Sequence, residues 1–175
     1  MKAKENQPEV WLRGSLPEIP DLLQPAAHAL KQAEEDVYKY TQDFPQDLLW
    51  SKPAGRASVG FHLNHLSGVL DRMLTYAEGK ELNENQFVFL KNEENPANSK
   101  TVDELVANFS IKVNEAIIQL KNTSVEILTE KRSVGRKKLP STVIGLLFHA
   151  AEHSQRHVGQ MLVTISVLKN LPKME

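Results

Sequence analysis

The chain has 175 residues, enough for one domain whose core is stable without disulfides, and its 41% hydrophobic and 25% charged residues are typical of a packed globular protein. Its 21 Lys and Arg residues nearly balance 22 Asp and Glu residues, so the net charge of -1 produces no overall field that would attract nucleic acid or an anionic membrane. The absence of cysteine excludes disulfides, thiolate metal sites and cysteine nucleophiles, which leaves histidine and carboxylate side chains as the usual metal ligands.

The sequence carries no sign of a targeting or membrane segment. Residues 1–14 lack an apolar core of signal-peptide length, and no stretch approaches the roughly 18 apolar residues of a membrane-spanning helix. We therefore expect a cytoplasmic protein in which residues 1–175 form a single domain with its core at about residues 10–169.

Two helices are predicted in the first half of the chain. The first spans residues 21–43, with Pro25 tolerated because it falls in the first turn. The second begins after Ser58, a favourable N-cap residue, and ends at Gly79. The apolar stripe of the first helix consists of Leu22, Ala26, Ala29, Ala33, Val37 and Tyr40.

Two further helices are predicted in the second half. After a polar connection at residues 83–100, Thr101 and Glu104 form a capping box for the third helix. The fourth is capped by Ser141 or Thr142 and continues to about residue 169. No strand signal has comparable strength, so the pattern predicts an all-α four-helix bundle.

A basic run precedes the last helix, at Lys131, Arg132, Arg136, Lys137 and Lys138. Basic side chains close to a helix N-terminus can hold an anion such as a carboxylate or phosphate group. Runs of this kind are more often solvated loops, and we expect that here.

The last predicted helix carries two histidines within its apolar stripe. His153 and His157 are four residues apart, so their rings lie one above the other on the same helix face, close enough to chelate one ion. Burial of imidazoles in a core costs free energy unless each nitrogen is paired, and coordination to a metal satisfies that need. The alternative is a pair of hydrogen-bonded core histidines, and His149, one turn earlier, is available to either arrangement.

The second predicted helix carries another pair, His62 and His65, either of which could supply a third ligand. On a helical wheel His62 lies nearer the centre of the apolar stripe, and His65 falls toward its edge. Periodicity alone does not decide between the two rings. His28 points away from the stripe of its own helix and is expected to face solvent.

Two separated motifs resemble those of a known family. The first is SVGFHLNHLSG at residues 58–68, followed by Asp71 and Arg72, and the second is EHSQRHVGQ at residues 152–160. WLRG at residues 11–14 and LLQPAAHAL at residues 22–30 also look like one branch of that family. Over roughly residues 10–169 the chain thus resembles the DinB-like metalloenzymes, which share the DinB/YfiT fold.

The resemblance implies a four-helix bundle of up-down-down-up topology that binds nickel or zinc through three histidines. By position in the family motifs these ligands are His65, His153 and His157, so the resemblance selects His65 where the helical wheel favours His62. Candidate residues around the ligands are Asn64, Asp71, His149, Glu152 and Gln160.

Two classes of function follow from three histidine ligands. Three protein ligands leave a coordination position open, as in catalytic sites, and relatives of the fold include thiol-S-transferases that use a low-molecular-weight thiol as cofactor. We therefore expect a metal-dependent transferase or hydrolase that acts on a small-molecule substrate. The alternative is a non-catalytic, stress-associated or interaction bundle in which the metal clamps two helices together, and a fourth ligand from His62 or His149 would favour it. Homodimerisation is expected because bundles of this kind commonly pair through helix faces.

Overall fold

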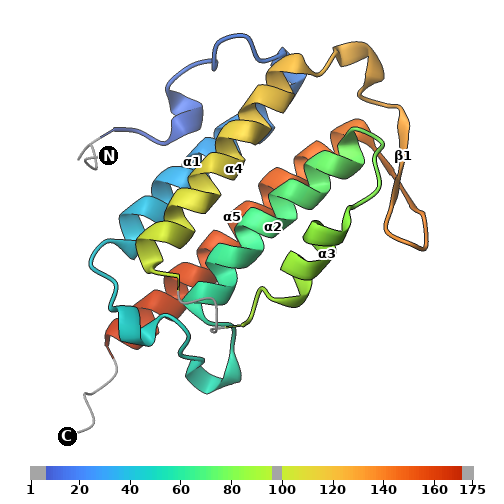
Figure 1. Ribbon diagram of the computed structural model, residues 1–175. Helices are drawn as coiled ribbons and strands as arrows, with labels where there is room; N and C mark the ends of the chain where they lie inside the picture. Colours follow the sequence, from blue (N-terminus) through green and yellow to red (C-terminus); the bar gives the residue numbers. More distant parts are fainter. Residues whose placement is uncertain (1–6, 96–99, 171–175) are drawn as a thin grey trace, which may run out of the picture.

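The computed structural model describes residues 7–95 and 100–170, and most of them are helical. The first six residues of the segment considered for a targeting signal, and residues 96–99 of the polar connection, lie outside the described residues. The long helices lie side by side (Figure 1). They are α1 (Gln24–Thr41), α2 (Val59–Ala77), α4 (Val102–Asn122) and α5 (Val143–Lys169). In the described part of the chain, no helix has both the length and the apolar character needed to cross a membrane.

Three of the long helices begin at hydroxyl caps that the sequence predicts. Ser58 accepts a hydrogen bond from the Phe61 N–H, Thr142 accepts one from the Gly145 N–H, and Thr101 forms a complete capping box with Glu104. Each cap satisfies an N–H group that the helix itself leaves unpaired. These contacts fix where α2, α4 and α5 begin.

The entry to α1 differs from the prediction. Residues Asp21–Leu23 form a 3-10 turn, and the α-helix begins only at Gln24. A 3-10 turn has about three residues per turn instead of 3.6, which changes the face on which each side chain lies. As a result Leu22, predicted in the apolar stripe, is 65% exposed, and Leu23 is buried in its place.

The polar connection between α2 and α4 contains a helix that the sequence reading missed. It is α3 (Glu84–Lys91), and it begins with a reciprocal capping box between Asn83 and Gln86. The Gln86 amide also donates to Asp71 and Thr75 of α2. These bonds hold α3 against α2, and the residues after α3 also lie against that helix, where the Asn64 amide donates to the Glu93 carbonyl.

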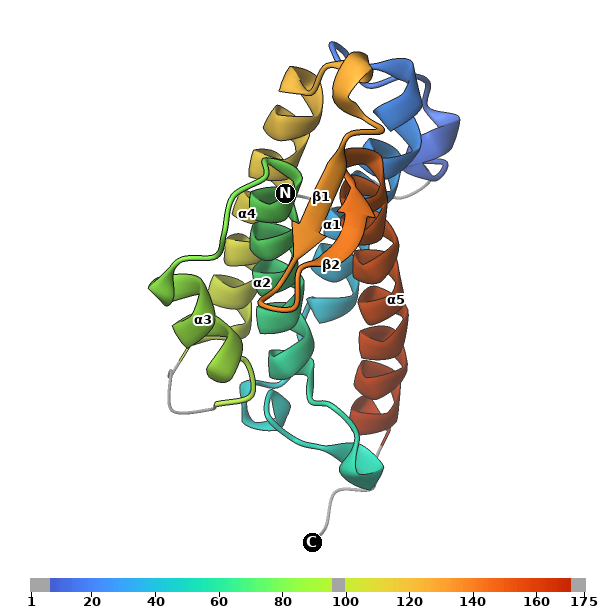
Figure 2. The ribbon, with the colours of Figure 1, turned by 90° about the vertical axis from the view of Figure 1, so that its right-hand side faces the viewer.

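The expectation of no strands is wrong, because the basic run forms a hairpin. Strands β1 (Lys131–Val134) and β2 (Leu139–Thr142) pair in antiparallel register, with a turn in which Gly135 and Lys138 have positive φ. The Arg132 side chain donates a hydrogen bond to the Ala77 carbonyl at the end of α2, so this residue of the basic run is not part of a solvated loop. The hairpin lies on the same side of the molecule as α3 and covers one end of α2 and α5 (Figure 2).

Short 3-10 turns occupy several of the connections: Val10–Leu12, Gln46–Leu48, Pro53–Gly55 and Val125–Ile127. The core is aliphatic, and α2 packs closely against α5 within it. Leu63, Leu66 and Leu70 of α2 are fully buried. Met161 of α5 is also fully buried, and Leu146 is nearly so. The histidines of both motifs lie along this α2–α5 interface.

Candidate metal centre

Three histidines from two helices converge at the α2–α5 interface. His65 comes from α2, and His153 and His157 come from successive turns of α5. One nitrogen from each ring lies within 4.8 Å of the other two. The ring centroids are 4.4 Å apart for His65 and His157, and 4.6 Å apart for His153 and His157. The residues that the family motifs single out are therefore neighbours in space.

The ring nitrogens face one another in two pairs. His65 Nε2 lies 2.9 Å from His153 Nε2, and His62 Nδ1 lies 3.0 Å from His157 Nδ1. When neutral, each ring carries one N–H and one lone pair, so a facing pair is stable only if one ring donates and the other accepts. Four ring nitrogens therefore lie close together, and within each facing pair of neutral rings one nitrogen carries a lone pair instead of a proton.

Burial keeps three of these rings neutral. Desolvation, reinforced by the neighbouring imidazoles, lowers the pKa of His157 to about 3, and desolvation with nearby His65 lowers the pKa of His62 to about 4. The pKa of His153 is lowered to about 4, again mainly by burial. Because a metal binds the deprotonated imidazole, rings of this kind need not lose a proton to bind an ion at neutral pH.

His153 has an unsatisfied nitrogen. Among the buried side-chain nitrogen and oxygen atoms that the structure describes, His153 Nδ1 lacks a hydrogen-bond partner. Burying such a group costs free energy, and it is unusual in a ring whose role is only structural. With the crowded and neutral nitrogens beside it, this atom indicates a donor set that fits a transition-metal cation.

The two histidines of α2 occupy different depths. His62 is 2% exposed, as its central place on the helical wheel indicates, and its Nδ1 lies beside Nδ1 of His157. His65 lies toward the edge, with 17% of its side chain exposed, and it is the α2 ring that joins the triad. The helical wheel thus indicates which ring is more deeply buried, and the family position indicates which ring lies beside His153 and His157.

The other residues predicted around the ligands differ in how close they lie to the triad. His149 and Glu152 are bonded to each other at 2.7 Å and form a second potential ligand group with His153. The Asn64 amide donates a hydrogen bond to the backbone carbonyl of Glu93, whose side chain contacts His65. The remainder lie elsewhere: Asp71 binds Gln86 and Lys112, and Gln160 is exposed. His28, expected to face solvent, is half-buried, and its Nε2 lies 3.0 Å from the Gly14 carbonyl oxygen.

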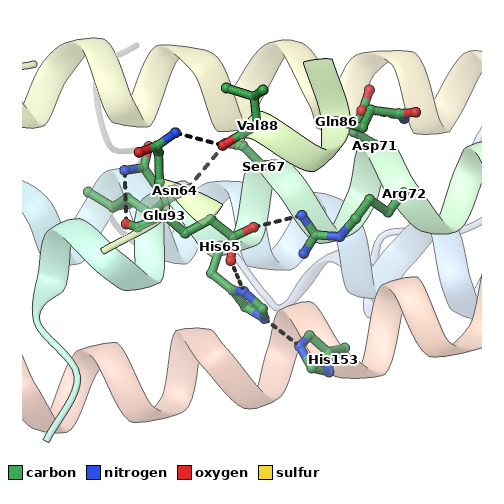
Figure 3. A network of polar contacts seen from close by, with 11 residues as sticks. Asn64, His65, Ser67, Asp71, Arg72, Gln86, Val88, Glu93 and His153 are labelled. Atoms are coloured by element: carbon green, nitrogen blue, oxygen red, sulfur yellow. Dashed lines mark hydrogen bonds and ion pairs between the residues drawn. The ribbon is translucent and has the colours of Figure 1, made fainter. Parts of the chain in front are cut away.

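A buried ion pair beside the centre was not predicted. Glu93 Oε2 lies 2.7 Å from His65 Nδ1, and its other oxygen accepts a hydrogen bond from Arg72, also at 2.7 Å (Figure 3). Arg72 belongs to the first motif, but Glu93 lies in the connection after α3, far from either motif in the sequence. The periodic pattern of the sequence gives no indication of this contact.

Comparison with protein families identifies the chain. The model of the DinB superfamily matches residues 29–161, which include all three histidines of the triad. The chain belongs to the DinB superfamily. No curated protein matches it. The DinB match extends from α1 into α5 and therefore covers both helices that supply the candidate ligands.

Proposed function

We propose that this DinB-superfamily protein binds one divalent transition-metal ion, nickel or zinc first, through His65, His153 and His157, and uses it in catalysis on a small molecule. The single observation that carries the proposal is the convergence of three ring nitrogens within 4.8 Å of one another. Their chemistry supports it, because imidazole nitrogens without any thiolate suit zinc, nickel and neighbouring metals of the first transition row.

An open coordination position supports a catalytic function over a structural one. Structural zinc sites normally use four protein ligands, and the triad supplies three. When bound at such a site, a divalent ion lowers the pKa of a coordinated water or thiol and polarises a coordinated carbonyl. The side chains of all three histidines are partly exposed, so a small molecule can approach them from solvent.

Thiol transfer is the first reaction class that we propose to test. The chain has no cysteine, so the sulfur must come from a low-molecular-weight thiol. In a transfer to a chlorinated aromatic compound, the sulfur forms a bond to the ring carbon, chloride leaves, and the thiol proton passes to solvent. The neutral histidines, with their lowered pKa values, do not compete for that proton at neutral pH.

The test begins with the metal content of untagged protein, measured by mass spectrometry. We expect about one equivalent in the wild type and none in a His153→Ala, His157→Ala double variant. The loaded protein is then incubated with a thiol and a chlorinated aromatic electrophile, and with ester substrates to test hydrolysis. Absence of metal in the wild type, even after incubation with zinc or nickel, would refute the proposal.

A second candidate is a metal-stabilised, non-catalytic bundle with a stress-associated or interaction role. The observation that favours it is the group formed by His149, Glu152 and His153, which offers further ligands beside the triad. Under this alternative, metal removal lowers thermal stability and no thiol or ester substrate is turned over. His149→Ala distinguishes the two, because it should reduce metal affinity only if His149 is a ligand.

We also propose the up-down-down-up four-helix arrangement implied by the family resemblance. The packing of α2 against α5 and α4, and of α1 against α5 and α4, supports it. In this arrangement α2 and α5 are neighbours over much of their length, which is the condition for one ion to bridge them.

A further inference from the structure

The Glu93 carboxylate is buried beside the candidate metal centre without being one of its ligands. Glu93 is 4% exposed, and each carboxylate oxygen has a partner: Oε2 faces His65 Nδ1, and Oε1 accepts from Arg72 Nη1 (Figure 3). Burial of a charged carboxylate costs desolvation free energy unless its oxygens accept hydrogen bonds or form ion pairs. This one is paired with a ring of the triad and with a cation from the same helix.

The sequence of α2 provides a place for that carboxylate. His65, Gly68 and Arg72 are spaced three and then four residues apart, so they lie along one face of the helix. A Cβ atom added at Gly68 would collide with Glu93 Oε1 and would lie 2.7 Å from Arg72 Nη1 and 2.8 Å from the Phe89 ring. The absence of a side chain at position 68 is therefore a condition for the Glu93 contact.

The backbone of the Glu93 segment is also attached to α2. The Asn64 amide donates a hydrogen bond to the Glu93 carbonyl, with a distance of 3.2 Å. Together with the Arg72 bond, this contact holds the connection after α3 at a fixed height along the helix. Glu93 is thus held at both its backbone and its side chain.

The Glu93 contact determines which nitrogen of His65 carries a proton. A carboxylate only accepts hydrogen bonds, so His65 Nδ1 must donate, and the lone pair then resides on Nε2. That nitrogen faces His153, at 2.9 Å. The Phe61 ring stacks on the same imidazole, with centroids 5.1 Å apart and planes 19° from parallel, which limits rotation of the ring.

We propose that Glu93 is a positioning residue of the metal centre: seated against Gly68 and anchored by Arg72, it holds His65 as the Nδ1–H tautomer with Nε2 directed at the ion. This inference rests on the proposed metal-binding function. A carboxylate that accepts from a ligating imidazole orients the ring and raises its basicity, and loss of such a partner typically costs about 10- to 100-fold in metal affinity.

The first test uses metal-free protein and needs no activity. Nitrogen chemical shifts of the histidine rings report the tautomer, and we expect His65 to be the Nδ1–H form in the wild type. Glu93→Ala should give a mixture of tautomers, whereas Glu94→Gln, a change at the adjacent and 62%-exposed carboxylate, should leave the His65 signals unchanged. An unaltered His65 tautomer in Glu93→Ala would overturn the inference.

The second test measures zinc affinity by competition with a coloured chelator. Glu93→Ala and Gly68→Ala should each bind zinc about 10- to 100-fold more weakly than the wild type, and Glu94→Gln should bind equally well. Because Glu93→Ala leaves Arg72 buried without its partner, Glu93→Gln, which keeps the shape and an accepting oxygen, is measured as well. We expect an intermediate loss of affinity with an unchanged helical circular-dichroism spectrum.

The outcomes separate this inference from the function on which it rests. Wild-type affinity in all the Glu93 and Gly68 variants would overturn the positioning role and leave the metal centre intact. Failure of the wild type to bind any metal would overturn the proposed function, and the positioning role with it. The tautomer measurement is independent of metal, so the two failures give different combinations of results.

Discussion

Replacing His62 by leucine should remove a large part of the acid sensitivity of the metal-free protein. His62 is 2% exposed, and burial, followed by the influence of His65, lowers its pKa from 6.5 to about 4. The unfolded chain exposes this ring and takes up a proton near pH 6.5, while the folded chain resists protonation until about pH 4. The stability that depends on neutral His62 is therefore complete above pH 6.5 and is lost as the pH falls toward 4.

The magnitude follows from the size of the pKa difference. Each pKa unit corresponds to about 1.4 kcal/mol, so the full difference is worth about 3 kcal/mol, and about 2 kcal/mol of it is lost by about pH 5. Leucine has no proton to gain and is similar in volume to the ring that it replaces, but it leaves His157 Nδ1 without the facing nitrogen of His62, so the variant should be less stable than the wild type at both pH values.

The assay is urea denaturation in the presence of a chelator, at about pH 7.5 and about pH 5. Between these conditions the free energy of unfolding should fall by about 2 kcal/mol more in the wild type than in His62→Leu. His153 and His157 are present in both proteins, but His62 also helps to lower the pKa of His157, so the difference reports His62 together with its effect on His157. Equal losses in the two proteins would refute the argument that the ring is held neutral by burial.

Three further predictions concern metal and packing. Zinc at about 100 times its Kd should stabilise the wild type by about 2.7 kcal/mol, or roughly 5–10 °C in Tm, and a chelator should reverse the shift; no shift in a thermal melt would contradict metal binding. Gly60→Ala should destabilise the protein by about 1–3 kcal/mol in urea, because the new Cβ would lie 2.8 Å from the Trp50 ring; Gly159→Ala, with open space around the new Cβ, is the control. Thr101→Ala should cost about 1 kcal/mol in the same assay, whereas Thr101→Ser, which keeps the capping hydroxyl, should cost little.

The parts of the fold that the sequence predicts are those governed by local chemistry. The caps at Ser58, Thr101 and Thr142 and the apolar stripe of α5 depend on residues within one or two turns of each other, so they can be read directly. The hairpin at β1 and β2 was missed because its strands are four residues each and strongly polar. Their pairing depends on tertiary contacts such as that of Arg132 with the end of α2.

In the candidate site, too, the residues related by local spacing could be predicted and those brought together by tertiary contacts could not. His153 and His157 are recognisable because their spacing places both rings on one helix face. Glu93 is not, because its contact with His65 spans 28 residues and depends on the short helix that precedes it. The local sequence does contain one related feature, because Gly68 lies between His65 and Arg72 on the same face of α2. This spacing can be interpreted only after the structure shows that a carboxylate packs there.

The contrast between His62 and His65 shows that the position of a ring on a helical wheel indicates its burial and not which ring lies beside the histidines of the other helix. The centre of an apolar stripe is the position most removed from water, and His62 is accordingly only 2% exposed, with its Nδ1 3.0 Å from His157 Nδ1. A catalytic ion would need one accessible coordination position, which favours the partly exposed ring of His65 over the buried ring of His62. At this edge position Glu93 Oε2 lies 2.7 Å from His65 Nδ1. For a metal site between two helices, the ring to examine first is therefore the partly buried one with a carboxylate behind it.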